Sequence, residues 1–136
     1  MTALLDTHLL LWIVLDSKRL TEFPWLDRYR PWTLSPISLL EVAFLNEIGR
    51  FELRQPEFTQ ALMVDPRFVI DEVPLVLLVR HAIEATWTRD PFDRLLVGHS
   101  AARRLPFVTA DRTIRDHHSL LAREIRPGSK APSSRT

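Results

Sequence analysis

Four acidic residues recur at equivalent points of this sequence, and together they suggest metal-dependent chemistry. Asp6 follows the first apolar segment, Asp111 follows a late one, and Glu41 and Asp93 lie in early turns of helix-like segments. Carboxylates that lie close together repel one another and raise one another's pKa unless a cation neutralises them. Such an oxygen-rich cluster suits Mg²⁺ or Mn²⁺, and a bound water of lowered pKa can attack a phosphodiester. Taken singly, each acid is better explained as a helix cap or a solvated charge.

Residues 89–111 form the unit that must position two of these acids. Asp90 is a good N-cap and Pro91 suits a first helical position, so a helix is predicted to begin there. It places Asp93 in its first turn, and Pro106 ends it. Its apolar positions recur at helical spacing: Leu95, Leu96, His99, Ala102 and Leu105. A short strand at 107–109 follows, with Asp111 just beyond its end.

The rest of the chain alternates in the same way, which predicts a parallel α/β sheet. Strands are expected at 2–5, 32–35, 68–70 and 107–109, with a last edge strand at 122–125. Helices are expected at 7–15, within 20–29, at 37–48, 51–64 and 75–87, with one more helical turn at 113–117. In open sheets of this kind, ligands bind at the carboxyl ends of the strands, where all four acids would gather.

Two of the predicted helices raise questions of packing. The segment 7–15 is apolar nearly all round, so it is either core or covered by a partner, and the sequence leaves both open. The segment 37–48 carries one apolar stripe, and Gly49 is its expected C-cap. That stripe consists of Ile37, Leu40, Phe44, Leu45 and Ile48.

Length and composition indicate one ordinary globular domain, expected over residues 1–126, with a disordered tail at 127–136 rich in Ser, Pro, Arg and Lys. The chain has 136 residues and no cysteine, which excludes disulfides, thiolate zinc sites and a cysteine nucleophile. We see no signal peptide, and the longest apolar run is too short to span a bilayer. A cytoplasmic location without membrane contact is therefore expected.

The net charge of +1 hides an asymmetry between the two parts of the chain. Residues 1–79 carry 7 basic and 11 acidic side chains, a balance of −4, whereas residues 80–136 carry 11 basic and 6 acidic ones, a balance of +5. Nearly all of the later positive charge is arginine, which suits phosphate recognition. On charge alone, an uneven surface explains this equally well.

Four blocks of the sequence resemble the motifs of PIN-domain ribonucleases, and within these the VapC-type toxins of type II toxin–antitoxin pairs. The blocks occur in the order and spacing of that family, and the likeness runs from the first strand to about residue 126. They are LLDTHLLLW (4–12), SPISLLEVAFL (35–45), RDPFDRLLVGHSA (89–101) and LPFVTADRTI (105–114).

The resemblance implies a three-layer α/β/α sandwich with a four- or five-stranded parallel sheet, and a Mg²⁺- or Mn²⁺-dependent endoribonuclease acting on RNA. Asp6, Glu41, Asp93 and Asp111 match the four family acids, and Asp111 matches the one that binds metal most loosely. Thr7 matches the small hydroxyl residue that supports a metal-bound water. The resemblance also implies a homodimer, and a cognate antitoxin bound in a groove near the N-terminal helices.

Arginine and histidine complete the candidate residues. Arg89, Arg94 and Arg112 are candidates to hold RNA phosphates, with a structural ion pair as the alternative for Arg94. His99 is expected to face away from the acids, as a packing or dimer-face residue rather than a base. His117 and His118 are expected on the surface, and His8 is expected to be structural.

Two other functions compete with the nuclease. A metal-dependent phosphatase or phosphoacceptor would use Asp6 as nucleophile, but position 8 is His8 rather than a second acid, and no lysine is well placed. A non-catalytic interaction module would retain the fold for binding RNA or a partner. The presence of all four acids argues against that module.

Overall fold

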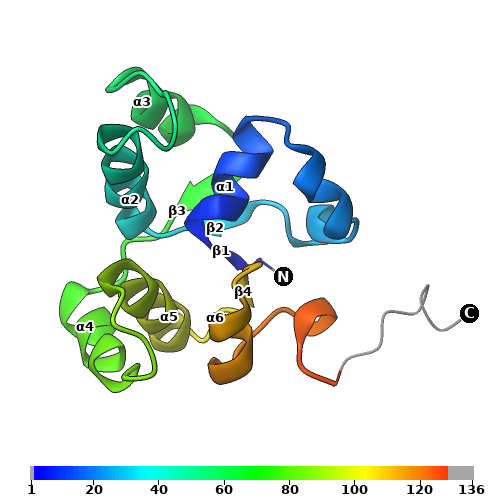
Figure 1. Ribbon diagram of the computed structural model, residues 1–136, viewed down its shortest axis with the longest axis vertical. Coiled ribbons are helices and arrows are strands. Elements are labelled where there is room, and N and C mark those ends of the chain that lie inside the picture. The colour runs from blue at the N-terminus through cyan, green and yellow to red at the C-terminus, as the bar shows by residue number, and fades with distance from the viewer. Residues whose placement is uncertain (1, 129–136) are drawn as a thin grey trace, which may run out of the picture.

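The computed structural model describes residues 2–128 and has the predicted alternation of strands and helices (Figure 1). Its strands are β1 (Leu4–Leu5), β2 (Trp32–Leu34), β3 (Phe68–Ile70) and β4 (Phe107–Val108). Its α-helices are α1 (Thr7–Val14), α2 (Pro36–Glu47), α3 (Glu57–Val64), α4 (Leu75–Glu84), α5 (Pro91–Arg103) and α6 (Arg112–His117). Three 3₁₀ helices complete the fold: η1 (Lys18–Glu22), η2 (Leu26–Tyr29) and η3 (Arg123–Ile125).

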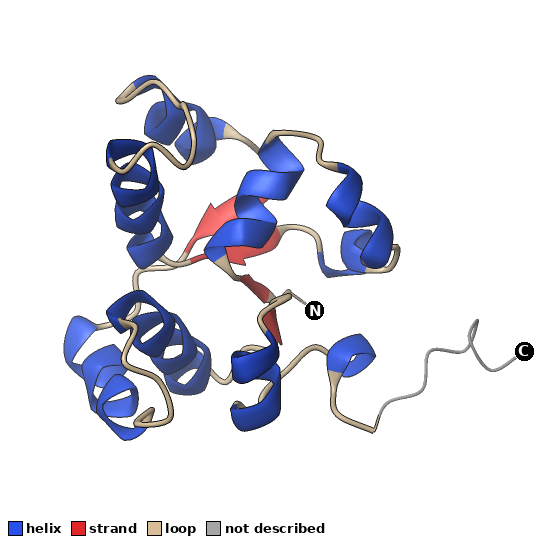
Figure 2. Cartoon of the chain, in the orientation of Figure 1, coloured by secondary structure: helices blue, strands red, loops and turns tan. Residues whose placement is uncertain are grey.

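The strands form one four-stranded sheet in the order β3-β2-β1-β4, and every pairing is parallel. Leu4 is paired with Thr33 on one side and with Phe107 on the other. The strands are short and helices surround them, as Figure 2 shows. The prediction of a parallel α/β fold is confirmed, with the lower of the two expected strand numbers.

Two apolar cores lie on the two faces of this sheet, because neighbouring residues of a strand point to opposite sides. Leu5 and Val108 belong to the larger core with α1, α2 and α3, whereas Leu4 and Phe107 belong to the smaller core with α5 and α6. Helix, sheet and helix therefore form three layers. The residues of α1 from Leu9 to Ile13 are buried, so its apolar surface is core.

Helix α2 presents a different face to the core from the one its apolar stripe predicts. Ser38, Glu41, Val42 and Leu45 are buried, whereas the exposed fractions of Leu40, Phe44 and Ile48 are 62%, 43% and 50%. Two stripes at helical spacing compete in this segment, and the partly polar one faces inward. Gly49, with φ of 81°, follows the helix as expected of a residue just beyond its end.

Other predicted elements need correction. The segment 20–29 is not one helix but two 3₁₀ turns, and the helices expected at 51–64 and 75–87 are shorter, as α3 and α4. The edge strand expected at 122–125 is wrong, because η3 occupies it and only Leu121 forms a bridge with Phe107. Most of the predicted tail, residues 129–136, lies outside the described residues. No helix within residues 2–128 is long and apolar enough to cross a membrane.

Helix α4 packs directly against α5, which carries Asp93 in its first turn. Gly98 allows the close approach, because a Cβ there would lie 2.6 Å from the carbonyl oxygen of Leu78 and 2.9 Å from the amide nitrogen of Ala82. Arg94 adds hydrogen bonds from its Nε to the Ala82 carbonyl at 3.1 Å and from Nη2 to the Ile83 carbonyl at 2.8 Å. These contacts fix α5, and with it the side chains of its first turn.

Candidate active site

Asp6 lies where β1 ends and α1 begins, and its carboxylate is buried. Although Asp6 is the N-cap residue of α1, its side chain makes no capping hydrogen bond. Instead Oδ2 accepts a hydrogen bond of 2.6 Å from the hydroxyl of Thr109, which follows β4. Burial raises the pKa of Asp6, and the nearby charge of Asp111 adds to the rise, against opposing hydrogen bonds from Thr109 and Thr7 and the charge of His8. The Asp6 carboxylate therefore does not cap α1.

Glu41 is the buried acid of α2, directed inward by the choice of helix face described above. Burial raises its pKa to about 7, and Asp6 and Asp90 add to the rise while Thr7 opposes it. Its Oε1 atom is buried without a hydrogen-bond partner in the described part of the chain. An unpaired carboxylate oxygen in the interior is costly, so this atom calls for a cation or a water.

Asp93 is the acid that interacts with all the others. The backbone amides of Phe92 and Asp93 donate to Oδ1 of the N-cap residue Asp90, so the Asp93 side chain is not needed for capping. Its pKa is raised to about 8, first by burial, then by the charge of Asp90, and then by Asp6, Asp111 and Glu41. The other acids therefore lie within electrostatic range of Asp93.

Asp111 has the weakest claim among the four. It is exposed and is the N-cap residue of α6, where its Oδ1 accepts a hydrogen bond of 3.0 Å from the Ile114 amide. Its backbone amide donates to the Thr109 hydroxyl oxygen at 3.0 Å. Asp111 therefore has one carboxylate oxygen committed to the helix, in keeping with the loose role that the resemblance implies.

The carboxylate oxygens of the acids are of the type that binds a divalent cation, but their side chains do not converge on one point. The carboxylates of Asp6, Glu41 and Asp93, each with a raised pKa, and the unpaired Glu41 Oε1 offer the oxygen ligands that Mg²⁺ and Mn²⁺ prefer. Within residues 2–128, however, no three acidic or histidine side chains already converge closely enough to hold an ion. The acids interact across the strand ends without meeting at one point.

Two hydroxyl residues support the acids, and sequence reasoning had named neither. Thr109 links Asp6 to the backbone of Asp111, and Ser38 lies 2.8 Å from the hydroxyl of Thr7, which is fully buried. The sequence position of each residue could have indicated this supporting role. Thr109 stands two residues before the fourth acid, where a strand ends, and Ser38 stands one turn before Glu41.

The three candidate arginines differ in their surroundings. Arg89 and Arg112 are exposed, in the loop before Asp90 and directly after Asp111. Arg94 instead donates from Nε and Nη2 to the last carbonyls of α4, as described above, and among residues 2–128 it forms no ion pair. Its contacts are those of a residue that positions two helices.

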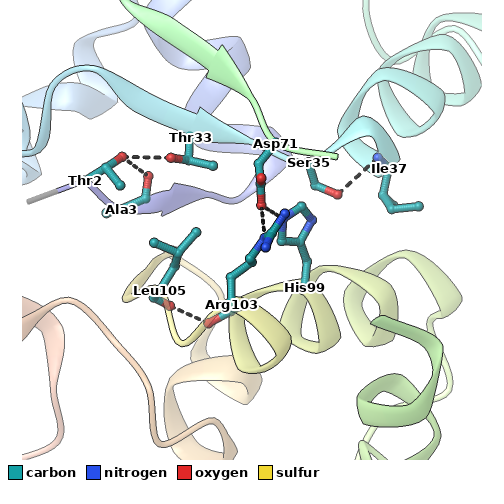
Figure 3. A network of polar contacts seen from close by, with 10 residues as sticks. Thr2, Ala3, Thr33, Ser35, Ile37, Asp71, His99, Arg103 and Leu105 are labelled. Carbon is teal, nitrogen blue, oxygen red and sulfur yellow. Dashed lines mark hydrogen bonds and ion pairs between the residues drawn. The ribbon is translucent and has the colours of Figure 1, made fainter. Parts of the chain in front are cut away.

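His8 lies in α1, where its ring packs 6.5 Å from that of Trp12 and its charge acts on Asp6. Of the predictions for the other histidines, one needs correction. His99 is fully buried in α5, and its Nε2 lies 2.8 Å from Oδ2 of Asp71, which also binds Nε of Arg103 at 2.9 Å (Figure 3). It is therefore a packing residue and not a dimer-face residue. His118 was expected on the surface but is half-buried against Ser100, with Nε2 and Oγ 2.9 Å apart, and burial lowers its pKa to about 4.

A parallel sheet with carboxylates gathered where its strands end defines an α/β protein with an acidic site at one edge of the sheet. The model of the PIN domain family matches residues 3–119, and the chain belongs to this family. PIN domains are in general metal-dependent nucleases. Neither the comparison with curated proteins nor that with solved structures finds a match.

Proposed function

We propose that this chain is an endoribonuclease that requires Mg²⁺ or Mn²⁺ and cuts RNA phosphodiester bonds at the acidic edge of its sheet. The observation that carries the proposal is the shared field around Asp93, whose pKa is raised by burial and by every other acid of the set. A charge arrangement that disfavours the ionised acids is stabilised by a bound cation. Membership of the PIN family supports the choice of a nuclease.

Each acid has a role that follows from its surroundings. Asp6, Glu41 and Asp93 would hold the metal, and Asp111 would contribute its uncommitted oxygen more weakly. When bound, the metal supplies a water of lowered pKa and neutralises charge on the phosphate. Thr109 fixes the Asp6 carboxylate, and Thr7 and Ser38 hold a buried hydroxyl pair beside Glu41.

Arg89 and Arg112 are proposed to bind phosphates of the RNA on the two sides of the acids. Both are exposed, and each lies within a few residues of an acid in sequence. Arginine donates two parallel hydrogen bonds to phosphate oxygens, and such contacts hold the backbone without reading the base. Arg94 is assigned to positioning α5.

The test is cleavage of a panel of structured and single-stranded RNAs by purified protein with Mg²⁺, with Mn²⁺ and with EDTA, beside Asp6→Asn. Metal-dependent cutting that is lost in Asp6→Asn is the expected result. The matched control is Asp16→Asn, which changes an exposed acid after α1 and should cut like wild type. Equal cutting by wild type and Asp6→Asn would overturn the assignment.

Two other results would favour the competing functions. A folded protein that binds RNA with or without metal and never cuts it would be an interaction module. A covalent acyl-phosphate at Asp6 would indicate the phosphatase. The second outcome is disfavoured because the Asp6 carboxylate is buried and its Oδ2 is already bonded to Thr109.

We also propose that the nuclease is the toxin of a toxin–antitoxin pair and forms a homodimer. Two exposed apolar surfaces support this. One consists of Leu40 and Phe44 of α2 with Ile48 just after it, and the other of Leu75, Val76, Leu77, Val79 and Ile83 of α4. Exposed apolar surface on this scale marks sites of protein association. A gene for a small DNA-binding protein next to this one, and an inhibitory complex of the two products, would support the toxin role.

A further inference from the structure

A cavity lined by none of the four acids has walls in which arginine is the most frequent residue. It has a volume of about 440 Å³ and lies between η2, the segment that joins α5 to β4, and η3. Its polar lining consists of Arg28, Tyr29, Arg104, Arg123, Glu124 and Arg126. We call it the arginine pocket.

The arginine pocket lies at the end of the sheet where the strands begin, whereas the acids lie at the end where the strands finish. Pro106 and Leu121 form part of its wall, and the Pro106 carbonyl, just before β4, accepts a hydrogen bond from the Leu4 amide, where β1 begins. The pocket therefore adjoins the strand starts, whereas Asp6 and Thr109 follow the strand ends. The two sites are separate, and the arginines cannot neutralise the acidic cluster.

The charge of the pocket is strongly positive. Four guanidinium groups face one carboxylate, that of Glu124, which is already engaged: its Oε1 accepts a hydrogen bond of 2.7 Å from the Tyr29 hydroxyl. Its Oε2 lies 3.7 Å from Arg28 and 3.9 Å from Arg123, and these are loose pairs. Arg126 is held at the wall by a hydrogen bond of 3.1 Å from Nε to the Leu121 carbonyl.

Arg104 adds an independent observation. It ends α5 in a left-handed conformation, with φ of 55° and ψ of 43°, where glycine is the residue without steric cost. Among residues 2–128 its side chain has no hydrogen-bond or ion-pair partner, although its backbone amide bonds to Ala101 and Ser100. Arg104 thus places a guanidinium group, unpaired among the described residues, at the pocket wall from a strained backbone position, and an anionic ligand in the pocket would account for both features.

We propose that the arginine pocket binds phosphate groups. Guanidinium groups match phosphate oxygens in geometry and stay charged at all relevant pH values. The phosphates come either from free phosphate compounds or from the backbone of a polynucleotide, and these share the same chemistry. The site goes beyond the proposed nuclease function and does not depend on it.

The test measures binding and not cleavage. Pyrophosphate is titrated by calorimetry and a labelled oligoribonucleotide by fluorescence anisotropy, in buffer freed of metal by a chelating resin so that no chelator anion competes. Arg104→Gly and Arg123→Gln should each weaken binding about tenfold, as the loss of a charged hydrogen-bond donor does. Glu124→Gln should tighten binding, because the Gln oxygen still accepts from Tyr29 while the repelling charge is gone.

The control is Arg80→Ala, which removes an exposed arginine of α4 outside the pocket and should leave binding unchanged. Arg104→Gly should unfold no more easily than wild type, since glycine accepts the left-handed conformation, and Arg123→Gln repeats the test at an exposed position. Loss of both ligands in the variants would show that free phosphate compounds suffice, and loss of the oligonucleotide alone would indicate the polynucleotide backbone. Binding of both ligands at wild-type strength by both variants would overturn the proposal, and the nuclease assignment would be unaffected.

Discussion

Thr109 is the residue on which the order of the acidic edge depends. Its hydroxyl donates to Asp6 and accepts from the amide of Asp111, so one side chain ties the ends of β1 and β4 together. Residues that orient metal ligands by hydrogen bonds contribute substantially to metal affinity and activity.

Thr109→Val should therefore reduce metal-dependent RNA cleavage by about 10- to 100-fold. It keeps the size of the side chain but removes both hydrogen bonds, which should lower the free energy of unfolding by roughly 1–3 kcal/mol. Cleavage rates and urea denaturation measure the two effects. Thr113→Val, at an exposed position of α6, is the matched control, and wild-type cleavage by Thr109→Val would contradict the role assigned to Thr109.

Gly98 sets the distance between two elements, α4 and α5. An alanine in a helix interior is normally about 1 kcal/mol better than glycine. Gly98→Ala should instead be destabilising and lower the free energy of unfolding by about 1–3 kcal/mol. The reason is that the alanine Cβ would meet the α4 backbone at Leu78 and Ala82. Ala102→Gly in the same helix, at a half-buried position, should cost only the ordinary helix propensity, and urea denaturation compares the two.

The exposed face of α4 is the element that a homodimer would cover. Val76 and Ile83 are 70% and 62% exposed and lie two turns apart on one side of the helix. Replacing both with Glu should leave the monomer folded, since neither is buried, and should dissociate the dimer in sedimentation equilibrium. A wild-type chain that sediments as a monomer at micromolar concentration would contradict the proposed homodimer.

The elements also show what the sequence could and could not predict. Four of the five predicted strands and the start of α5 depend on local signals, such as the Asp90 cap followed by Pro91, and these predictions are confirmed. The inward face of α2 depends on packing, because Ser38 and Glu41 face the acidic edge at the expense of a more apolar stripe. No local pattern distinguishes two competing stripes, and contacts such as that of Thr109 with Asp6 join residues 103 positions apart.

For the whole molecule, stability should depend on pH in a way that the metal reverses. The folded chain holds protons on Glu41 and Asp93 up to pKa values of about 7 and about 8, whereas the unfolded chain loses them near 4.5 and 3.8. The folded state therefore binds more protons, and stability falls as pH rises through this range. Burial lowers the pKa of His118 to about 4, so His118 favours unfolding on acidification instead.

Above the ordinary histidine pKa, Glu41 and Asp93 are the groups named here that still contribute to the pH dependence of stability. This pH range therefore reports on these acids and not on His118. Between about pH 6.5 and about pH 8.5 the metal-free protein should lose on the order of 1–3 kcal/mol of stability. Mg²⁺ or Mn²⁺ should restore it, most strongly at the higher pH, and Asp93→Asn should flatten the dependence. Urea denaturation measures this, with Asp116→Asn on α6 as control, and a metal-free stability that rises over this window would contradict the shared acidic field.

The two margins of the sheet differ in a way that limits how copies of this protein can join. Leu121 forms a bridge with Phe107 of β4. The Phe107 amide donates to the Leu120 carbonyl and the Ala122 amide donates to the Phe107 carbonyl, so the outer side of β4 is already paired. In the described residues, β3 is the other margin with no strand alongside it. If copies pair by strand addition, each has one usable margin, so the growing sheet stops at two chains. A fold with one blocked margin is protected against endless fibre growth through its sheet.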